Sequence, residues 1–210
     1  MFAFSLAYAS ALPHVAAALE AKLPQAIDPA RTAVLVMHYQ DDIIGIFEPA
    51  TMKGYLDRVG SVIDKAHKAG SPVVLVKIGF SEGYPEISPN NKNGQMIKSF
   101  GLFVDDKLPD AFDVRPGDTV LTAHRASAFA GTGLDEKLKQ MGVDTLIMAG
   151  ITTTGVVMSS LSDASDLDYR ILVLEDGCFD PDPLAHRKLF EVPFATRADA
   201  ITAAQAVDML

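Results

Sequence analysis

The sequence predicts an α/β protein, a three-layer α/β/α sandwich around a mainly parallel sheet of six strands. Short apolar runs rich in β-branched residues alternate with segments of helical periodicity, which is typical of a parallel sheet with helices on both faces. The apolar runs lack a clean polar/apolar alternation, as expected of strands buried on both faces. The predicted strands are Ala33–His38, Val73–Ile78, Thr119–Thr122, Thr145–Ala149, Ile171–Leu174 and a last strand near Ala200.

Helices are predicted in the gaps between these strands. Thr51–Ala69 places Leu56, Val59 and Ile63 at helical spacing, and Gly70 is expected to end this helix. Because parallel sheets of this kind place their active sites beyond the carboxyl ends of the strands, the residues that follow each strand are the candidates for function. The later predicted helices are Gly133–Met141, Thr154–Leu167 and Leu184–Phe190.

One connection is longer than a simple link needs to be. Gly79–Gly101 contains glycine, proline and asparagine throughout, together with Phe80, Tyr84 and Glu86. A long irregular segment in a compact domain is usually functional or disordered, and its aromatic residues favour function. We expect a lid or a pocket wall here.

Composition limits the classes of function. The chain has 210 residues, of which 49% are hydrophobic and 21% charged, so it can build a sizeable core. A net charge of −9 argues against nucleic acid or an anionic membrane as the main partner. A single cysteine excludes a disulfide framework and fits a reducing compartment, so a cytoplasmic location is expected.

The N-terminal residues 1–12 are uncharged but too short to span a membrane, and they lack the basic start of a signal peptide. We therefore expect an N-terminal arm over residues 1–29, which packs on the domain or on a neighbouring subunit, and a single domain over residues 30–210.

Polar residues and glycines follow three of the predicted strands. His38-Tyr39-Gln40-Asp41-Asp42 follows the first strand, Ala123–Thr132 begins as the third strand ends, and Gly150–Val157 follows the fourth. The last of these segments reads as a strand, a turn and a helix. Backbone N–H groups at such a turn are expected to point into the cleft as an anion or oxyanion hole.

These three segments, in this order, resemble the isochorismatase-like cysteine hydrolases, which include nicotinamidases, carbamoylsarcosine amidases and ureidoacrylate amidohydrolases. The resemblance covers about residues 30–205. It implies the same fold, dimers or tetramers, and a non-proline cis peptide near Ile151-Thr152. The family patterns V-I-D-M-Q-x-D, K-x-R-x-S-A-F-x-G-T and G-V-x-T-x-x-C-V are matched by Val36–Asp42, Ala123–Thr132 and Gly150–Val157.

The chain departs from the family pattern at the catalytic positions. The family triad is Asp, Lys and Cys, and the corresponding residues here are His38, Ala123 and Val156. Valine cannot attack a carbonyl, so covalent cysteine catalysis of the family type is excluded. Cys178 is expected to be a buried structural thiol. The resemblance also implies that catalysis without this nucleophile is possible, since isochorismatases proper carry glycine at the cysteine position.

We therefore expect a hydrolase or lyase that acts on a small carboxylate- or amide-bearing molecule, with His38 as general acid or base. The turn Ile151–Gly155 would supply N–H donors. Arg125 could hold a carboxylate through two parallel hydrogen bonds. The residues expected to contact substrate are Gln40, Tyr84, Arg125, Phe129, Ile151, Thr152, Thr153, Gly155 and Val156.

Two alternatives stay open, namely a pseudoenzyme that binds a small molecule and a structural oligomer with a filled pocket. A packed apolar site around Val156, with His38 bonded to backbone, would favour the second. Thr152–Thr154 could simply cap a helix. No cofactor is expected. No metal is expected either, because the five histidines lack metal-ligand spacing and residues 41–49 contain none. His14, His67, His186 and Asp163 are expected at the surface.

Overall fold

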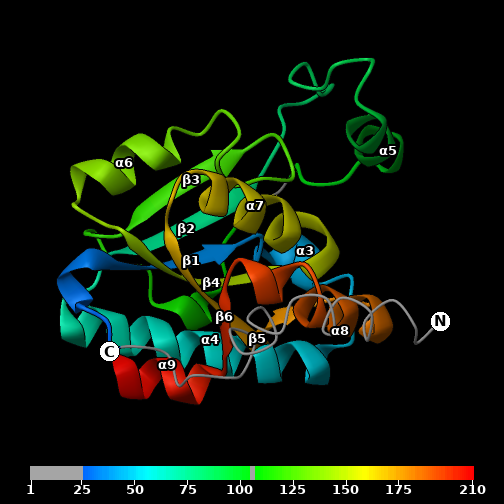
Figure 1. Cartoon of the computed structure of the whole chain (residues 1–210). Coiled ribbons are helices and arrows are strands. Elements are labelled where there is room, and N and C mark those ends of the chain that lie inside the picture. The colour runs from blue at the N-terminus through cyan, green and yellow to red at the C-terminus, as the bar shows by residue number, and fades with distance from the viewer. Residues whose placement is uncertain (1–25, 105–106) are drawn as a thin grey trace, which may run out of the picture.

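The strands form one sheet at the centre of the molecule. The computed structural model describes residues 26–104 and 107–210, so most of the predicted arm over residues 1–29 lies outside the described residues. The sheet order is β3-β2-β1-β4-β5-β6, and every pair is parallel, which confirms the predicted fold class (Figure 1). The strands are β1 (Thr32–Met37), β2 (Val73–Ile78), β3 (Thr119–Ala123), β4 (Thr145–Ile151), β5 (Arg170–Phe179) and β6 (Asp199–Ile201).

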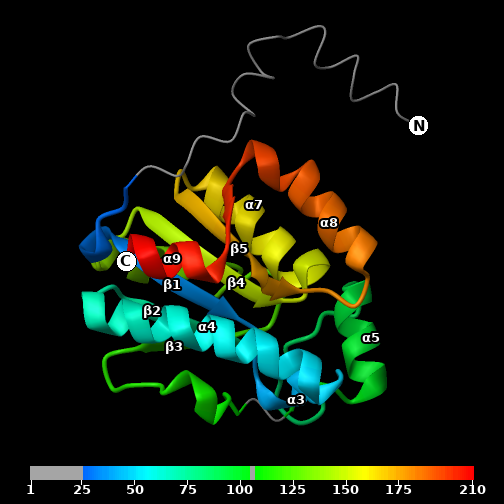
Figure 2. The ribbon, with the colours of Figure 1, turned by 90° about the horizontal axis from the view of Figure 1, so that it is seen from below.

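Helices cover both faces of the sheet. Figure 1 shows α4 and α9 on one face and α6 and α7 on the other, while α5 stands away from these layers. Figure 2 shows α4 and α9 running along the sheet when it is viewed from below. None of the helices in the described part of the chain is long and apolar enough to cross a membrane. The α-helices are α3 (Asp41–Ile44), α4 (Pro49–Ala69), α5 (Lys92–Phe100), α6 (Leu134–Gln140), α7 (Met158–Asp166), α8 (Pro183–Glu191) and α9 (Ala203–Met209).

The central strand β1 divides the core into two apolar layers. All six of its residues are buried, as predicted for a strand covered on both faces. Val34 and Val36 belong to the layer under α4, and Leu35 and Met37 to the layer under α6 and α7. Because successive side chains of a strand point to opposite faces, one strand supplies both layers.

The long helix α4 begins and ends close to the prediction. Glu48 caps its start by accepting a hydrogen bond of 2.7 Å from the Thr51 N–H, and Pro49 occupies the first turn. Gly70 follows the last turn with a φ of 75°, a left-handed conformation that glycine adopts without strain. The prediction that this helix ends at Gly70 is confirmed.

Two parts of the prediction are wrong. The fifth strand does not end at Leu174, because a register shift between Met148 and Gly150 of β4 lets β5 continue to Phe179. The segment Gly79–Gly101 is not irregular throughout, since its second half forms α5. The side chain of Asn91 caps that helix by accepting a hydrogen bond of 3.0 Å from the Gly94 N–H.

Candidate functional site

The carboxyl ends of β1 and β4 bring two of the predicted site segments together. Met37 aligns with Gly150 in the sheet, so His38 lies beside the turn that follows β4. Gly150 is required here, since a Cβ on it would lie only 3.1 Å from Val156 Cγ1 and 3.3 Å from the Met37 carbonyl oxygen. Val156 therefore packs against Gly150, where the ends of β1 and β4 meet.

His38 is a buried imidazole in an unusual backbone conformation. Its φ is 58°, its backbone N–H donates to the Val76 carbonyl at 2.8 Å, and the residue is only 5% exposed. Nε2 is buried and has no hydrogen-bond partner within the described structure. Burial lowers the pKa of His38 to about 3. The resting imidazole is therefore neutral at neutral pH and is not an acid.

The other two triad-like positions are apolar and packed. Ala123 and Val156 belong to the same buried cluster as Met37 and Cys178. Burial raises the pKa of the Cys178 thiol to about 12. A thiol with this pKa and no exposure is not a nucleophile, in agreement with the structural role expected for it.

The turn after β4 has the predicted geometry, but its donors are partly used. The Ile151-Thr152 peptide is cis, which confirms the expectation, and Thr153–Val157 forms a π-helical turn, η3. The Thr154 N–H and hydroxyl both donate to Asp180 Oδ2, at 2.7 and 2.6 Å. The Gly155 N–H donates to the Thr152 carbonyl at 3.1 Å. A carboxylate of the protein thus occupies part of the expected anion hole.

Asp180 and His186 were not predicted as site residues. Asp180 is buried and follows β5 directly, so it would have been found as a strand-end residue had that strand been predicted to its true end. His186 was expected at the surface and this is wrong, because it is half-buried and its Nδ1 lies 2.8 Å from the hydroxyl of fully buried Thr153. Asp180 ties the turn to the segment that leads into α8, and His186 ties it to α8 itself.

Gln40 faces the protein rather than the cleft. It is fully buried, its Oε1 accepts a hydrogen bond of 2.9 Å from the Ile78 N–H, and its Nε2 donates to the Ile78 carbonyl. Both ends of the amide are therefore used to hold the end of β2 against β1.

Arg125 and Tyr84 bond to backbone carbonyls around the long loop. Arg125 donates from Nη2 to the Glu86 carbonyl at 3.1 Å and from Nη1 to the His124 carbonyl. The Tyr84 hydroxyl donates to the Leu102 carbonyl at 3.0 Å. Arg125 therefore fastens the loop to the end of β3, and two of its N–H groups are already used.

Phe129 is half-buried and packs against the protein's own core. Its ring centroid is 6.1 Å from that of Tyr169, and it packs against the cluster beneath α6 and α7. The neighbouring Ser127 hydroxyl donates to Asp163 Oδ2 at 2.5 Å. The expectation that Asp163 is solvated is therefore wrong, since it anchors the segment that follows β3.

The comparisons agree with this architecture. The family model described as Isochorismatase domain matches residues 32–205. The chain is 30% identical over 179 residues to "Ureidoacrylate amidohydrolase RutB" of Rhizobium rhizogenes, covering 73% of this chain and 72% of the relative. N-carbamoylsarcosine amidase from Thermoplasma acidophilum superposes with a TM-score of 0.68 and 26% identity, over 82% of this chain and 96% of that one.

A cysteine hydrolase from Pseudomonas syringae pv. phaseolicola 1448A has the same fold. It superposes with a TM-score of 0.78 over 90% of this chain and 97% of its own, at 18% identity. The resemblance inferred from the strand-end motifs therefore extends over the whole sheet.

Proposed function

The chain belongs to the isochorismatase family, and from this premise we propose that it is a hydrolase that acts on a small amide- or carboxylate-bearing molecule without a cysteine nucleophile. Valine stands at position 156, and the only cysteine is fully buried with a raised pKa. Neither residue can attack a carbonyl carbon. The proposed reaction is therefore direct addition of water.

The observation that carries this proposal is the buried Nε2 of His38, which lacks a hydrogen-bond partner in the described residues. A buried polar atom costs free energy unless it is paired, and such atoms cluster at sites that a ligand completes. Since Met37 aligns with Gly150 in the sheet, a substrate carbonyl held at the turn after β4 would lie at the same edge of the sheet as His38.

In the proposed reaction, water adds to the substrate carbonyl carbon and gives one proton to His38 Nε2. The proton then passes to the leaving nitrogen as the carbon–nitrogen bond breaks. A neutral imidazole is the form that can accept a proton, but a pKa of about 3 makes it a weak base. A substrate carboxylate beside the ring would raise that pKa, so a substrate that carries both an amide and a carboxylate fits best. Ureidoacrylate, named in the relatives, is of this class.

A binding protein without turnover is the second candidate. It is favoured by the carboxylate of Asp180, which takes the Thr154 N–H that would otherwise stabilise an oxyanion. In this candidate the same edge of the sheet binds the molecule but lacks the donors that lower the barrier.

Turnover of a mixed panel of small amides, ureides, esters and vinyl ethers, read by NMR, separates these functions. We expect His38→Ala to lower turnover by about two to four orders of magnitude, and Cys178→Ser to leave it unchanged. Equal turnover in His38→Ala would remove His38 from the mechanism, and loss in Cys178→Ser would contradict a cysteine-independent reaction. Line broadening of a panel member without turnover, abolished in His38→Ala, would support the binding protein.

We also propose a homodimer or homotetramer. Helix α5 stands away from the sheet layers and exposes Met96 and Phe100, the latter to 71% (Figure 1). Apolar side chains in such a position are typical of subunit contacts. Light scattering of the purified chain checks this, and a monomer would contradict it.

A further inference from the structure

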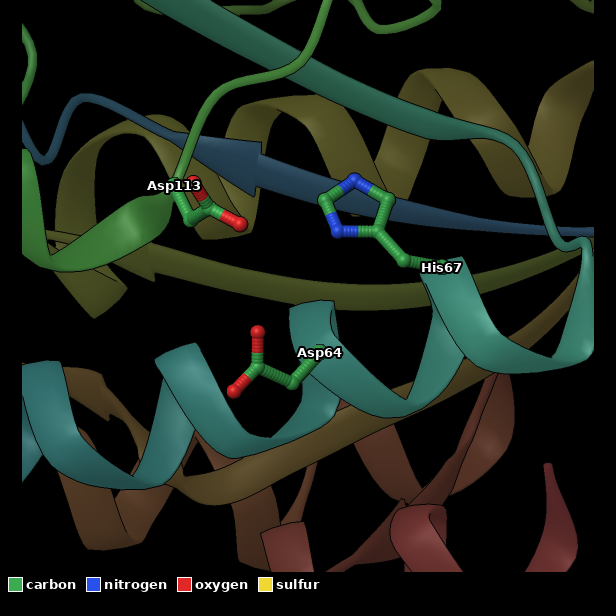
Figure 3. A group of neighbouring side chains, drawn as sticks. All are labelled: Asp64, His67 and Asp113. Carbon is green, nitrogen blue, oxygen red and sulfur yellow. The ribbon is translucent and has the colours of Figure 1, made fainter.

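A second group of polar side chains lies on α4, far from the strand ends described above. Asp64 and His67 are three residues apart on this helix and therefore share one of its faces. Asp113 comes from the turn after η2 (Asp110–Phe112) and lies opposite them (Figure 3). One candidate ligand atom from each of the three side chains, an imidazole nitrogen or a carboxylate oxygen, lies within 4.8 Å of the other two.

The orientation of His67 is fixed by a fourth residue. Its Nε2 lies 2.9 Å from Asp118 Oδ1, and the side chains of His67 and Asp118 are only 7% and 5% exposed. The other oxygen of Asp118 accepts a hydrogen bond of 2.8 Å from the Arg115 N–H, so the carboxylate is held at both ends. In the neutral imidazole, a carboxylate beside Nε2 favours the ring proton on that nitrogen, which leaves the lone pair on Nδ1.

Nδ1 of His67 is buried and has no hydrogen-bond partner in the part of the chain that the structure describes. Figure 3 shows the imidazole ring facing the carboxylates of Asp64 and Asp113. A lone pair aimed at two carboxylates is unfavourable as it stands, because no proton lies between these groups. A cation among the three side chains would pair all of them.

We propose that Asp64, His67 and Asp113 form a binding site for a divalent transition metal ion, with Zn²⁺ as the best fit. One imidazole nitrogen and two carboxylate oxygens are ligands that Zn²⁺ takes in proteins, and the imidazole disfavours Mg²⁺ and Ca²⁺, which prefer oxygen. Asp118 bonds the distal ring nitrogen, as carboxylates do behind metal-bound histidines. Water would complete the coordination on the exposed side.

The geometry needs only small side-chain movements. Zinc–ligand bonds of about 2.0–2.2 Å require the donor atoms to close to roughly 3.5 Å. Asp64 and Asp113 are exposed, so their carboxylates can rotate toward the buried ring. Arg115 bonds Asp113 through Oδ2, at 2.8 Å from its Nη2, so coordination would use Oδ1. The bound ion would join the end of α4 to the segment that leads into β3.

Zinc titration of the full-length chain, free of any affinity tag and stripped with a chelator, tests the site by calorimetry and thermal unfolding. We expect one strong Zn²⁺ site per chain that raises the melting temperature. Asp64→Asn and Asp113→Asn should each weaken binding by about tenfold or more, and both change exposed side chains that the fold does not need. Asp57→Asn, on an exposed part of the same helix, is the control and should bind like the wild type.

Two results would overturn the proposal. One is the absence of a strong Zn²⁺ site in the wild-type chain. The other is binding of equal affinity in both Asn variants, which would place the ion elsewhere. A second readout is the imidazole nitrogen spectrum, in which zinc should shift the Nδ1 signal of His67 and leave that of His38 in place.

Discussion

Two buried histidines lie at opposite ends of the molecule, and each has one ring nitrogen without a hydrogen-bond partner among the described residues. His38 follows β1 at the carboxyl ends of the strands and is 5% exposed, with burial as the cause of its lowered pKa. His67 lies near the end of α4, where the chain turns back toward the start of β2, and its second nitrogen faces Asp118.

The difference shows how the surroundings assign a role to one side chain. Burial without a charged partner lowers the pKa of His38 and keeps its ring neutral, which suits an uncharged or anionic organic ligand. Three carboxylates gather around His67, which suits a cation. An unpaired nitrogen alone would not distinguish these ligands, so the predictions below alter the surroundings of each ring.

The largest effect concerns the dependence of stability on pH at His38, which amounts to about 5 kcal/mol between pH 6.5 and pH 3. Its pKa is about 3 in the folded protein, against an ordinary value of 6.5. Between these values the unfolded chain binds a proton that the folded chain does not, so stability rises with pH. The stability that depends on neutral His38 is fully present above pH 6.5, and the free energy of unfolding falls by about 1.4 kcal/mol per pH unit as the pH decreases toward 3.

His38→Asn removes that pH dependence, and asparagine tolerates the left-handed backbone of this position. Urea unfolding at pH 5 and pH 8 measures the effect. The free energy of unfolding of the variant minus that of the wild type should be about 2 kcal/mol larger at pH 5 than at pH 8, so the variant gains relative stability at the lower pH. If the difference between variant and wild type were the same at both pH values, His38 would be protonated or solvated in the folded chain.

Asp180 should have the next largest effect, because its buried carboxylate accepts two hydrogen bonds from Thr154. Asp180→Ala removes the acceptor of the Thr154 N–H and hydroxyl, and should lower the free energy of unfolding by about 3 kcal/mol. Asp182→Ala removes only the cap of α8, at 2.9 Å from the Leu184 N–H, and should cost about 1 kcal/mol. Urea unfolding measures both.

Added formate tests whether the turn after β4 can bind an external carboxylate when Asp180 is removed. If the turn is an anion hole that Asp180 fills, formate should raise the melting temperature of Asp180→Ala more than that of Asp182→Ala or the wild type. The same small response in all three proteins would mean that the turn does not bind an external carboxylate.

Much of the fold could be predicted, because strands buried on both faces are continuous apolar runs. Val73–Ile78 is predicted to the residue. The end of β5 could not be predicted, because Glu175 and Asp176 interrupt its apolar run. Only pairing with β4 extends the strand to Phe179. Helix α5 was missed because asparagine and glycine in its first turn are typical of loops.

The site was predicted less completely, for a physical reason. The strand-end rule found His38 and the turn after β4, since both follow strands that pair directly. Partners that approach from distant segments leave no local pattern, as for Asp180 at the Thr154 N–H. The same holds for His67, expected at the surface but nearly buried against Asp118, so that expectation is wrong.

The smallest effects are expected for two arginine variants, each of which should change only one of two regions, the carboxyl-edge loop or the α4 site. Arg125→Ala should leave the free energy of unfolding within about 1 kcal/mol of wild type, since only one surface-facing side chain is lost. It removes the hydrogen bond to the Glu86 carbonyl, so amide hydrogen exchange in residues 81–87 should speed up by about tenfold. Zinc affinity should not change.

Arg115→Ala should change zinc affinity and leave hydrogen exchange in the loop unchanged. It releases Asp113 Oδ2 from an ion pair of 2.8 Å, so zinc binding should tighten by a few-fold while exchange in residues 81–87 stays as in the wild type. Hydrogen exchange and calorimetry on both variants make the comparison. If either arginine affected both readouts, the carboxyl-edge loop and the α4 site would be coupled, and the two histidines could not be treated as independent sites.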